Sequence, residues 1–384
     1  MNFFNRMIER VFVPFKPLPP GIYPYQTPPD APVQYRLHLR IEPDGEGILV
    51  VNAKTVLHLN QTATEFIYHL VQKTPEDSAV DQIARRYHVK KDLARQDYVE
   101  LTQRIRELIA TPDLDPETFL DFQRLDPHFK DLSAPLRLDC ALTYQVSEPV
   151  SKEVAPVERV GRELLTEEWK TILEKAWNAG IPHIIFTGGE PTLRPDLPEL
   201  IAHCEKLGQV TGVLTDGFRL TDTQYFHQLL QSGLDHLMIL LQPGEDRSWE
   251  AVRDAIAEDI HVTVHLTIDQ GDASLFMPLL DRLCDMGVKE ISLSATDPSF
   301  AETLQVLRAA AADRLLTLVW DLAVPYSNVH PVALEIAEHE KPPSGAGRAW
   351  LYVEPDGDVL PAQGVTQVLG NLLTDPWEKI WQNR

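Results

Sequence analysis

The hydrophobic and polar positions of the chain change their pattern near residue 136. From there on, short apolar runs typical of buried strands alternate with longer stretches whose apolar residues recur at helical spacing. The strand-like runs are Leu136–Leu142, His183–Thr187, Val210–Thr215, His236–Leu241, Val262–Ile268, Glu290–Ala295 and Leu315–Trp320, and the helical stretches are Thr166–Ala179, Asp196–Leu207, Thr221–Ser232, Ser248–Ala257, Leu275–Met286 and Ala301–Ala312. Strands that alternate with helices predict βαβ units, right-handed crossovers and a parallel sheet. We therefore expect an α/β body of six or seven units.

A body of this kind over residues 133–325 fits a partial (β/α)6 barrel similar to the TIM barrel. In such barrels, the loops at the carboxyl ends of the strands carry the functional groups. We therefore expect the functional residues in those loops.

The preceding residues, 33–112, have the pattern of a small separate α+β unit. Tyr35–Ile41 and Gly47–Val51 are strand-like and flank the turn signal Pro43-Asp44-Gly45, and Thr55–Leu59 gives a third short strand. Asn60 can cap the first of three amphipathic helical stretches that follow. Three small strands and three helices predict a winged-helix-like domain.

The remaining segments have simpler patterns. The apolar residues of Met1–Val13 fall on one face of a short helix, which either anchors the chain to a membrane surface or a partner, or packs on the chain's own body; we prefer the second. Pro14–Pro32 holds eight prolines and predicts an extended linker or surface wrap within the N-terminal segment 1–32. Residues 113–132 are expected to be a second linker, and residues 326–384 a C-terminal extension.

Composition and charge remove several functional classes. The 384 residues include 35 Lys and Arg against 57 Asp and Glu, a net charge of −22 that disfavours nucleic-acid binding. The three cysteines, Cys140, Cys204 and Cys284, exclude a disulfide framework or zinc ribbon. No uncharged apolar run approaches the roughly 18 residues of a spanning helix, and Met1–Val13 has no secretory signal. We expect a cytoplasmic protein without a transmembrane segment.

The loop after the second predicted strand of the α/β body reads Thr187-Gly188-Gly189-Glu190-Pro191. Its glycines allow close approach to a ligand, and Glu190 adds an acceptor at the rim. The motif resembles the loop with which radical S-adenosylmethionine (SAM) enzymes hold the methionine part of their cofactor. A plain glycine turn with a surface glutamate is the alternative.

The next two strand ends resemble the same family less closely. Leu214-Thr215-Asp216-Gly217 stands where the family usually has Thr-Asn-Gly, and Leu240-Leu241-Gln242 stands where it commonly has Ser-Leu-Asp. The resemblance implies cofactor contacts by Gly188, Gly189, Glu190, Pro191, Thr215, Asp216 and Gln242. His265 lies on the polar face of the fifth strand, as either a substrate contact or a hydrogen-bonded core histidine.

The cysteines that define the resembled family are depleted here. Radical SAM enzymes hold a [4Fe–4S] cluster with Cys-x-x-x-Cys-x-x-Cys after the first strand, whereas this chain has Cys140, Tyr144 and Ser147 at that spacing. A phenol and an alkanol replace soft thiolates poorly. Cys140 is then the sole surviving ligand position, because Cys204 and Cys284 lie in predicted helices. We expect no [4Fe–4S] cluster and leave SAM binding open.

The small N-terminal unit resembles PqqD-like domains through Leu59-Asn60-Gln61-Thr62-Ala63. These domains recognise peptides in ribosomal-peptide biosynthesis by adding the peptide as a strand beside their sheet. The resemblance implies a peptide-binding edge at Thr55, Val56, Leu57, His58 and Leu59, with help from the helix near Asp97–Leu108. A DNA-binding winged helix is the alternative, supported by five basic residues at Lys90, Lys91, Arg95, Arg104 and Arg106 but opposed by the acidic total.

In the C-terminal extension, Ala349–Glu354 and Asp358–Leu360 predict a hairpin around Pro355-Asp356-Gly357. This hairpin resembles the SPASM region of peptide-modifying radical SAM enzymes, which carries auxiliary iron–sulfur clusters. The family follows this hairpin with Pro-Cys, but here it is Pro361-Ala362, and no cysteine follows Cys284. The extension is therefore expected to be a structural cap without clusters.

Three functions follow from these patterns. The first is a degenerate radical SAM-like protein in ribosomal-peptide or cofactor maturation, which binds a leader or precursor peptide. It either presents that peptide to a catalytic protein partner, or binds SAM or another small ligand without reductive cleavage. The second is an active peptide-modifying enzyme whose cluster is ligated by Cys140 and oxygen ligands. The third is another enzyme on the same barrel, with acid–base groups such as Glu190, Asp216, His265 and Asp321.

Overall fold

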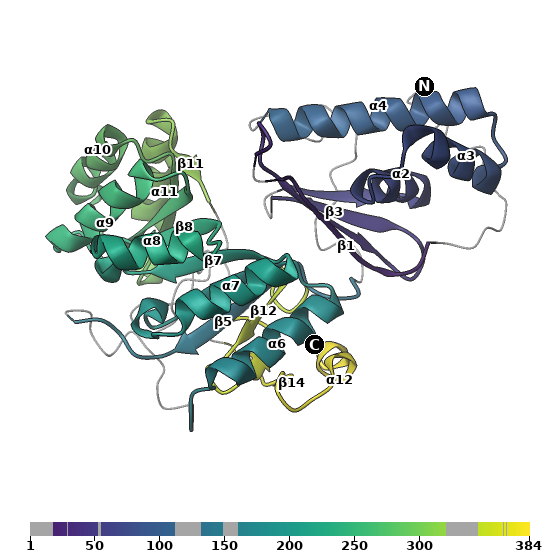
Figure 1. Cartoon of the computed structure of the whole chain (residues 1–384). Coiled ribbons are helices and arrows are strands. Elements are labelled where there is room, and N and C mark those ends of the chain that lie inside the picture. Colours follow the sequence, from purple (N-terminus) through teal and green to yellow (C-terminus); the bar gives the residue numbers. More distant parts are fainter. Residues whose placement is uncertain are drawn as a thin grey trace. The chain divides into compact units, whose positions relative to one another are not determined.

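The computed structural model describes residues 18–28, 30–52, 55–111, 132–148, 160–319, 345–363, 365 and 367–384 (Figure 1). The predicted helix within Met1–Val13, most of the linker at 113–132, and Asp321 lie outside these residues. The chain forms two compact units, Met1–Ser133 and Ala134–Arg384, and each is described by itself.

The first unit is an antiparallel sheet followed by three helices. Its strands are β1 (Gly21–Gln26), β2 (Arg36–Ile41), β3 (Gly47–Val51) and β4 (Thr55–Leu59), in the order β1-β2-β3-β4, and its helices are α2 (Gln61–Val71), α3 (Glu76–Tyr87) and α4 (Lys91–Ala110). The three expected strands and three helices are therefore present. β1 was not expected, since it comes from the proline-rich segment, and it extends the sheet beyond the boundary predicted at residue 33.

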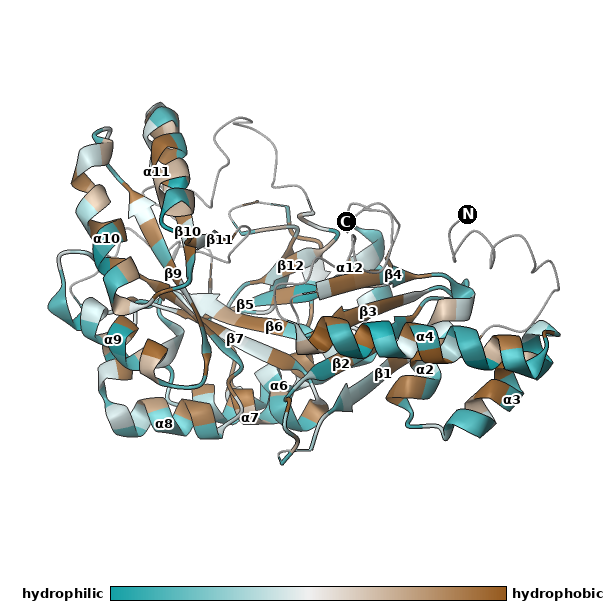
Figure 2. Cartoon of the chain, turned by 90° about the horizontal axis from the view of Figure 1, so that it is seen from above, coloured by the Kyte–Doolittle hydropathy of each residue, from teal (hydrophilic) through white to brown (hydrophobic). Residues whose placement is uncertain are grey.

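The local sequence explains these elements. Asn60 caps α2 by accepting a hydrogen bond from the main-chain nitrogen of Ala63 at 2.9 Å. Alternate residues of β2, including Leu39, pack on α2 residues such as Phe66 in one apolar core. Hydrophobic and hydrophilic bands alternate along α4 (Figure 2), as expected for a helix that buries one side.

The second unit is a ten-stranded sheet in the order β11-β10-β9-β8-β7-β6-β5-β12-β13-β14. Its parallel strands are β5 (Arg137–Thr143), β6 (His183–Gly188), β7 (Val210–Thr215), β8 (His236–Leu240), β9 (His261–Ile268), β10 (Glu290–Ala295) and β11 (Thr317–Leu318), and the helices between them are α6 (Thr166–Ala179), α7 (Leu197–Leu207), α8 (Thr223–Gln231), α9 (Asp246–Ala257), α10 (Met277–Met286) and α11 (Ala301–Asp313). The six strand–helix units of the predicted α/β body are present, and β11 is shorter than predicted.

The two faces of this sheet differ in polarity. Because consecutive strands are neighbours, right-handed crossovers place the helices on one face. Residues on that face are apolar, as Cys140 in β5 and Phe186 in β6 illustrate. On the opposite face, Thr263 of β9 stands beside Glu290, and His265 stands beside Ser292. The polar face predicted for β9 is confirmed and lies away from the helices.

The C-terminal residues continue the main sheet. β12 (Trp350–Val353) pairs in parallel with β5, and β13 (Asp358–Leu360), β14 (Gly370–Asn371) and α12 (Trp377–Gln382) follow. The predicted hairpin is confirmed as β12 and β13. The rings of Trp377 and Trp381 stack with centroids 5.5 Å apart, and Trp381 is buried. None of the helices in the described residues is long and apolar enough to cross a membrane.

Candidate cofactor site at the strand ends

The Gly188-Gly189 turn joins the end of β6 to the segment after β5. The main-chain nitrogen of Gly189 donates to Thr143 O at 2.8 Å, and that of Glu190 donates to Gln145 O at 2.7 Å. A Cβ atom on Gly188 would collide with Thr143 O, and one on Gly189 with Gln145 O. The glycines are therefore required for this close approach, and the amides of residues 189 and 190 are already used by the chain.

Glu190 is 1% exposed and does not stand at the rim as expected. Its Oε1 atom accepts hydrogen bonds from the Thr192 amide at 3.0 Å, the Thr192 hydroxyl at 2.5 Å and the Thr215 hydroxyl at 2.8 Å. Its Oε2 atom accepts from the Asp216 amide at 2.7 Å. This geometry ties β6 to β7 and favours neither a direct cofactor contact nor the surface-glutamate alternative.

Asp216 lies beside Glu190 and is 5% exposed. Its Oδ1 atom accepts a hydrogen bond from the Phe218 amide at 2.9 Å, and the Ser147 hydroxyl and the Arg247 charge also act on it. Burial and the neighbouring Asp216 raise the pKa of Glu190 to about 8, and burial also raises the pKa of Asp216. Near neutral pH, the two carboxyl groups therefore share negative charge rather than each carrying a full one.

The other residues implied by the resemblance lie at the same end of the sheet. Pro191 opens a short 3-10 turn over Pro191–Leu193 and is buried. Thr215 donates to Glu190 and accepts from the Gly217 amide at 3.0 Å, so its hydroxyl is engaged on both sides. Gln242 follows β8, is half-buried, and donates its main-chain N–H to Ser248 Oγ at 3.0 Å. All of the expected cofactor residues thus gather at the carboxyl ends of β6, β7 and β8.

Cys140 does not lie at that end of the sheet. The strand continues to Thr143, so Cys140 falls inside β5, fully buried on the helix-facing side. Burial raises the pKa of its thiol well above the usual range, and the neighbouring thiol of Cys204 on α7 raises it further. The side chain of a mid-strand residue projects from a face of the sheet rather than beyond the strand's end, so this placement does not favour Cys140 as a cluster ligand, and that role stays a prediction.

Tyr144 and Ser147 do not converge with Cys140. The Tyr144 hydroxyl donates to Glu354 Oε1 at 3.2 Å and lies 3.0 Å from the Tyr352 hydroxyl, whereas Ser147 faces Asp216. The segment from Tyr144 to Arg159 contains no cysteine at all. Within the described residues, the carboxyl ends of the strands present no thiol, so the donor set does not fit a [4Fe–4S] cluster.

His265 belongs to the polar interior. Its Nδ1 atom lies 3.1 Å from Ser292 Oγ and its Nε2 atom 2.8 Å from Ser294 Oγ, and the side chain is fully buried. Both ring nitrogens thus have partners on β10. This arrangement favours the hydrogen-bonded core histidine over the substrate contact.

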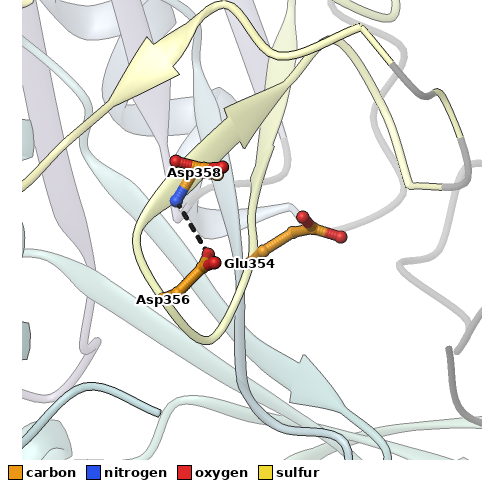
Figure 3. A group of neighbouring side chains, drawn as sticks. All are labelled: Glu354, Asp356 and Asp358. Atoms are coloured by element: carbon orange, nitrogen blue, oxygen red, sulfur yellow. Dashed lines mark hydrogen bonds between the residues drawn. The ribbon is translucent and has the colours of Figure 1, made fainter. Parts of the chain in front are cut away.

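Sequence reasoning did not anticipate a group of acidic residues at the C-terminal hairpin. Figure 3 shows Glu354, Asp356 and Asp358 around its turn, where the Asp358 amide donates to Asp356 Oδ1 at 3.2 Å. Asn371 donates to Asp358 Oδ1 at 2.9 Å, and Tyr144 donates to Glu354. These carboxylates serve the turn and the packing beneath it, which is the structural role of an Asp-rich hairpin.

Comparisons with known proteins show which family this chain belongs to. The model of the radical SAM superfamily matches residues 140–280. A PqqA peptide cyclase of Streptomyces rochei is 30% identical over 255 residues, which cover 59% of this chain and 70% of that protein. A PqqA peptide cyclase of Methylobacterium sp. (strain 4-46) is 25% identical over 289 residues, which cover 66% and 74%.

Solved structures share the fold. The crystal structure of Streptococcus suis SuiB bound to S-adenosylmethionine has a TM-score of 0.59 at 15% identity, covering 90% of this chain and 86% of SuiB. SuiB bound to its precursor peptide SuiA has a TM-score of 0.59 at 14% identity, covering 89% and 86%. By sequence and fold together, this chain belongs to the radical SAM superfamily, among the relatives of the PqqA peptide cyclases.

Proposed function

We propose that this chain is a non-redox member of its family that binds a precursor peptide and presents it to a catalytic partner. The placement of thiols carries the proposal: Cys140 lies inside β5, and the loop that follows has no cysteine through Arg159. A cluster that cleaves SAM needs three protein thiolates and an open iron. The barrel then keeps its fold without the group that performs the family's redox chemistry.

The edge of the first sheet supports the peptide part of the proposal. β4 is one edge of the four-stranded sheet, and β1 is the other. β1 carries Pro24, which cannot donate a hydrogen bond to a further strand, whereas Thr55–Leu59 contains no proline. A peptide that adds a strand is therefore expected beside β4, as the PqqD-like resemblance implies. A relative in fold, SuiB, has been solved with its precursor peptide.

The charges of the first unit argue against the DNA-binding alternative. Arg95 on α4 lies 2.6 Å from both Glu76 and Asp77, and Lys91 lies 2.6 Å from Asp81. Arg104 lies 2.8 Å from Glu100. Three of the five basic residues that kept this alternative open are thus neutralised by acidic neighbours, which weakens attraction to a phosphate backbone.

For the second unit, we propose binding of SAM or a similar small ligand without reductive cleavage. The Gly188-Gly189 turn, Asp216 and Gln242 lie together at the carboxyl ends of the strands and support this proposal. Glu190 and Thr215 would act behind them, because their polar atoms already hold the strand ends together. A fold of this kind does not by itself specify the ligand.

Metal analysis tests the first part. After anaerobic reconstitution of the full chain with iron and sulfide, we expect no stoichiometric cluster and no 5′-deoxyadenosine from SAM under strong reductant. A four-iron cluster with SAM turnover would overturn the proposal and restore the active-enzyme alternative.

Peptide binding is tested separately, by methyl NMR of the full chain. The methyl groups of Val56, Leu57 and Leu59 report on the β4 edge, and those of Ile22 report on the β1 edge. We expect titration with PqqA peptide to shift the β4 signals and leave Ile22 unchanged. Shifts confined to the second unit would contradict this assignment.

A further inference from the structure

Polar residues also begin the parallel strands, at the end of the sheet opposite the cofactor site. β6, β8, β9 and β10 start with His183, His236, His261 and Glu290. In the strand register, His236 stands beside His261, and Glu290 stands two residues beyond it, beside Thr263. These side chains belong to the face that the helices leave open. We call the three imidazoles and Glu290 the histidine row.

Two imidazoles of the row meet across β7. His183 Nε2 and His236 Nε2 lie 2.8 Å apart, although β6 and β8 are not adjacent in the sheet. Gly212 of β7 makes this contact possible, because a Cβ atom there would collide with the His236 ring. A glycine in mid-strand usually weakens a sheet. Gly212 is therefore best explained by the room that it gives to the His236 ring.

The third imidazole, His261, starts the neighbouring strand and stands beside His236 in the strand register. His261 Nε2 lies 2.8 Å from Glu290 Oε2, and the Thr263 hydroxyl donates to the same oxygen at 3.2 Å. The His261 side chain is 49% exposed and can rotate, whereas Glu290 is largely buried. A carboxylate that accepts from one ring nitrogen of a histidine leaves the other nitrogen as a metal ligand, which is a common outer contact of metal sites.

We propose that the histidine row binds one divalent transition-metal ion of the Zn²⁺ class, with His183 Nε2 and His236 Nε2 as ligands, His261 as the third ligand and Glu290 behind it. Neutral imidazole is the ligand such ions favour in proteins. At Zn–N distances of about 2.0–2.1 Å, two ligands of a tetrahedral ion lie about 3.3 Å apart. An ion between the two nitrogens therefore needs the rings of His183 and His236 to move apart by about half an ångström. The His261 side chain must also rotate to reach the ion.

The test is metal binding by the full chain, without an affinity tag and freed of metal. Titration with Zn²⁺ against a chromogenic chelator gives affinity and stoichiometry, and the visible absorption of bound Co²⁺ reports nitrogen ligands. We expect one equivalent to bind, with affinity at least tenfold weaker in His183→Asn and in His261→Ala. Gly212→Ala is expected to weaken binding similarly, because it displaces the His236 ring without removing a ligand.

His227→Ala is the matched control. The His227 imidazole is also 49% exposed and lies 3.3 Å from a glutamate, Glu258, but it stands alone on α8. Its removal should leave Zn²⁺ affinity unchanged. Asp356→Asn separates binding at the acidic hairpin from binding at the row. The proposal fails if Zn²⁺ does not bind at about 100 µM, if Co²⁺ shows oxygen ligands only, or if His183→Asn and Gly212→Ala, both folded by circular dichroism, retain the original affinity.

Discussion

At the carboxyl ends of β6 and β7, a buried pair of carboxyl groups is surrounded by donors from the chain itself. At the amino ends of β6, β8 and β9, His183 and His236 contact each other, and His261 contacts Glu290. These side chains lie on the face of the same sheet that is turned away from the helices. The first set is held by four hydrogen bonds to Glu190, two from Thr192 in the same turn and two from Thr215 and Asp216 at the end of β7. The second depends on one short contact, between His183 and His236, across a glycine.

The two ends differ in what surrounds their polar groups. The end that holds the cofactor in the family is here joined by internal hydrogen bonds, and the described residues at that end include no cysteine. The other end places the imidazoles of His183 and His236 beside the half-exposed His261. Substitutions at the two ends should therefore have different consequences, for stability at the carboxyl end and for metal affinity at the amino end.

Gly188→Ala should have the largest effect. Gly188 has a φ of +124°, which side-chain-bearing residues rarely adopt, and its Cβ would collide with Thr143 O. We expect the free energy of unfolding to fall by more than about 3 kcal/mol, measured by urea denaturation. Gly244→Ala, where a Cβ would have open space and φ is not positive, should change it by less than about 0.5 kcal/mol. Equal effects at both positions would show that the turn is not locked.

Glu190→Ala should come next. It leaves the amides of Thr192 and Asp216 and the Thr215 hydroxyl without their acceptor in a buried place. We expect a loss of about 3 kcal/mol in the free energy of unfolding. Glu190→Gln should lower the free energy of unfolding by less than Glu190→Ala. The glutamine oxygen can still accept hydrogen bonds, and its NH2 group would face only one other donor, the Asp216 N–H. A loss below about 0.5 kcal/mol for Glu190→Ala would mean that Glu190 is free for a ligand after all.

Asp216→Asn should alter the pH dependence of stability. The pKa of Glu190 is raised from 4.5 to about 8, so the folded chain binds this proton more tightly than the unfolded chain. The resulting stabilisation is fully present below about pH 4.5 and is lost as the pH rises through about 8. Removing the Asp216 charge lowers the Glu190 pKa and should flatten this decline.

The measurement is urea denaturation at several pH values from 5 to 8.5. The control is Asp285→Asn, because that side chain is exposed on α10. It should leave the decline unchanged. An unaltered decline in Asp216→Asn would show that the two carboxyl groups do not share their charge.

The sequence predicted the elements of the second unit well because each is a local pattern. Val210–Thr215 and Glu290–Ala295 were predicted with the bounds that the structure shows, since they are apolar runs between clear helical stretches. β1 was missed because prolines disfavour strands, and Pro24 is tolerated only where a sheet edge leaves its missing donor unneeded.

The sites were harder to predict, because their geometry depends on residues far apart. Glu190 was placed at the correct strand end, but its burial follows from Thr215 and Asp216, which no local pattern connects to it. Cys140 was placed by spacing alone, although the continuation of β5 to Thr143 puts it in mid-strand. The histidine row was not predicted, because parallel α/β folds place functional groups at the carboxyl ends of the strands, yet three histidines that begin strands were a readable signal.

Cys140→Ala should have the smallest effect. The Cys140 thiol faces the helices, so the substitution removes only a small buried group between β5 and α7. We expect the free energy of unfolding to fall by about 1 kcal/mol, and the iron retained after reconstitution to equal that of the unaltered chain. Cys204→Ala is the matched control, because it removes the neighbouring thiol of the same pair and should give the same two results. If Cys140→Ala alone abolished bound iron, the thiol would have to reach the carboxyl end of the sheet, and the contrast between the two ends would no longer hold.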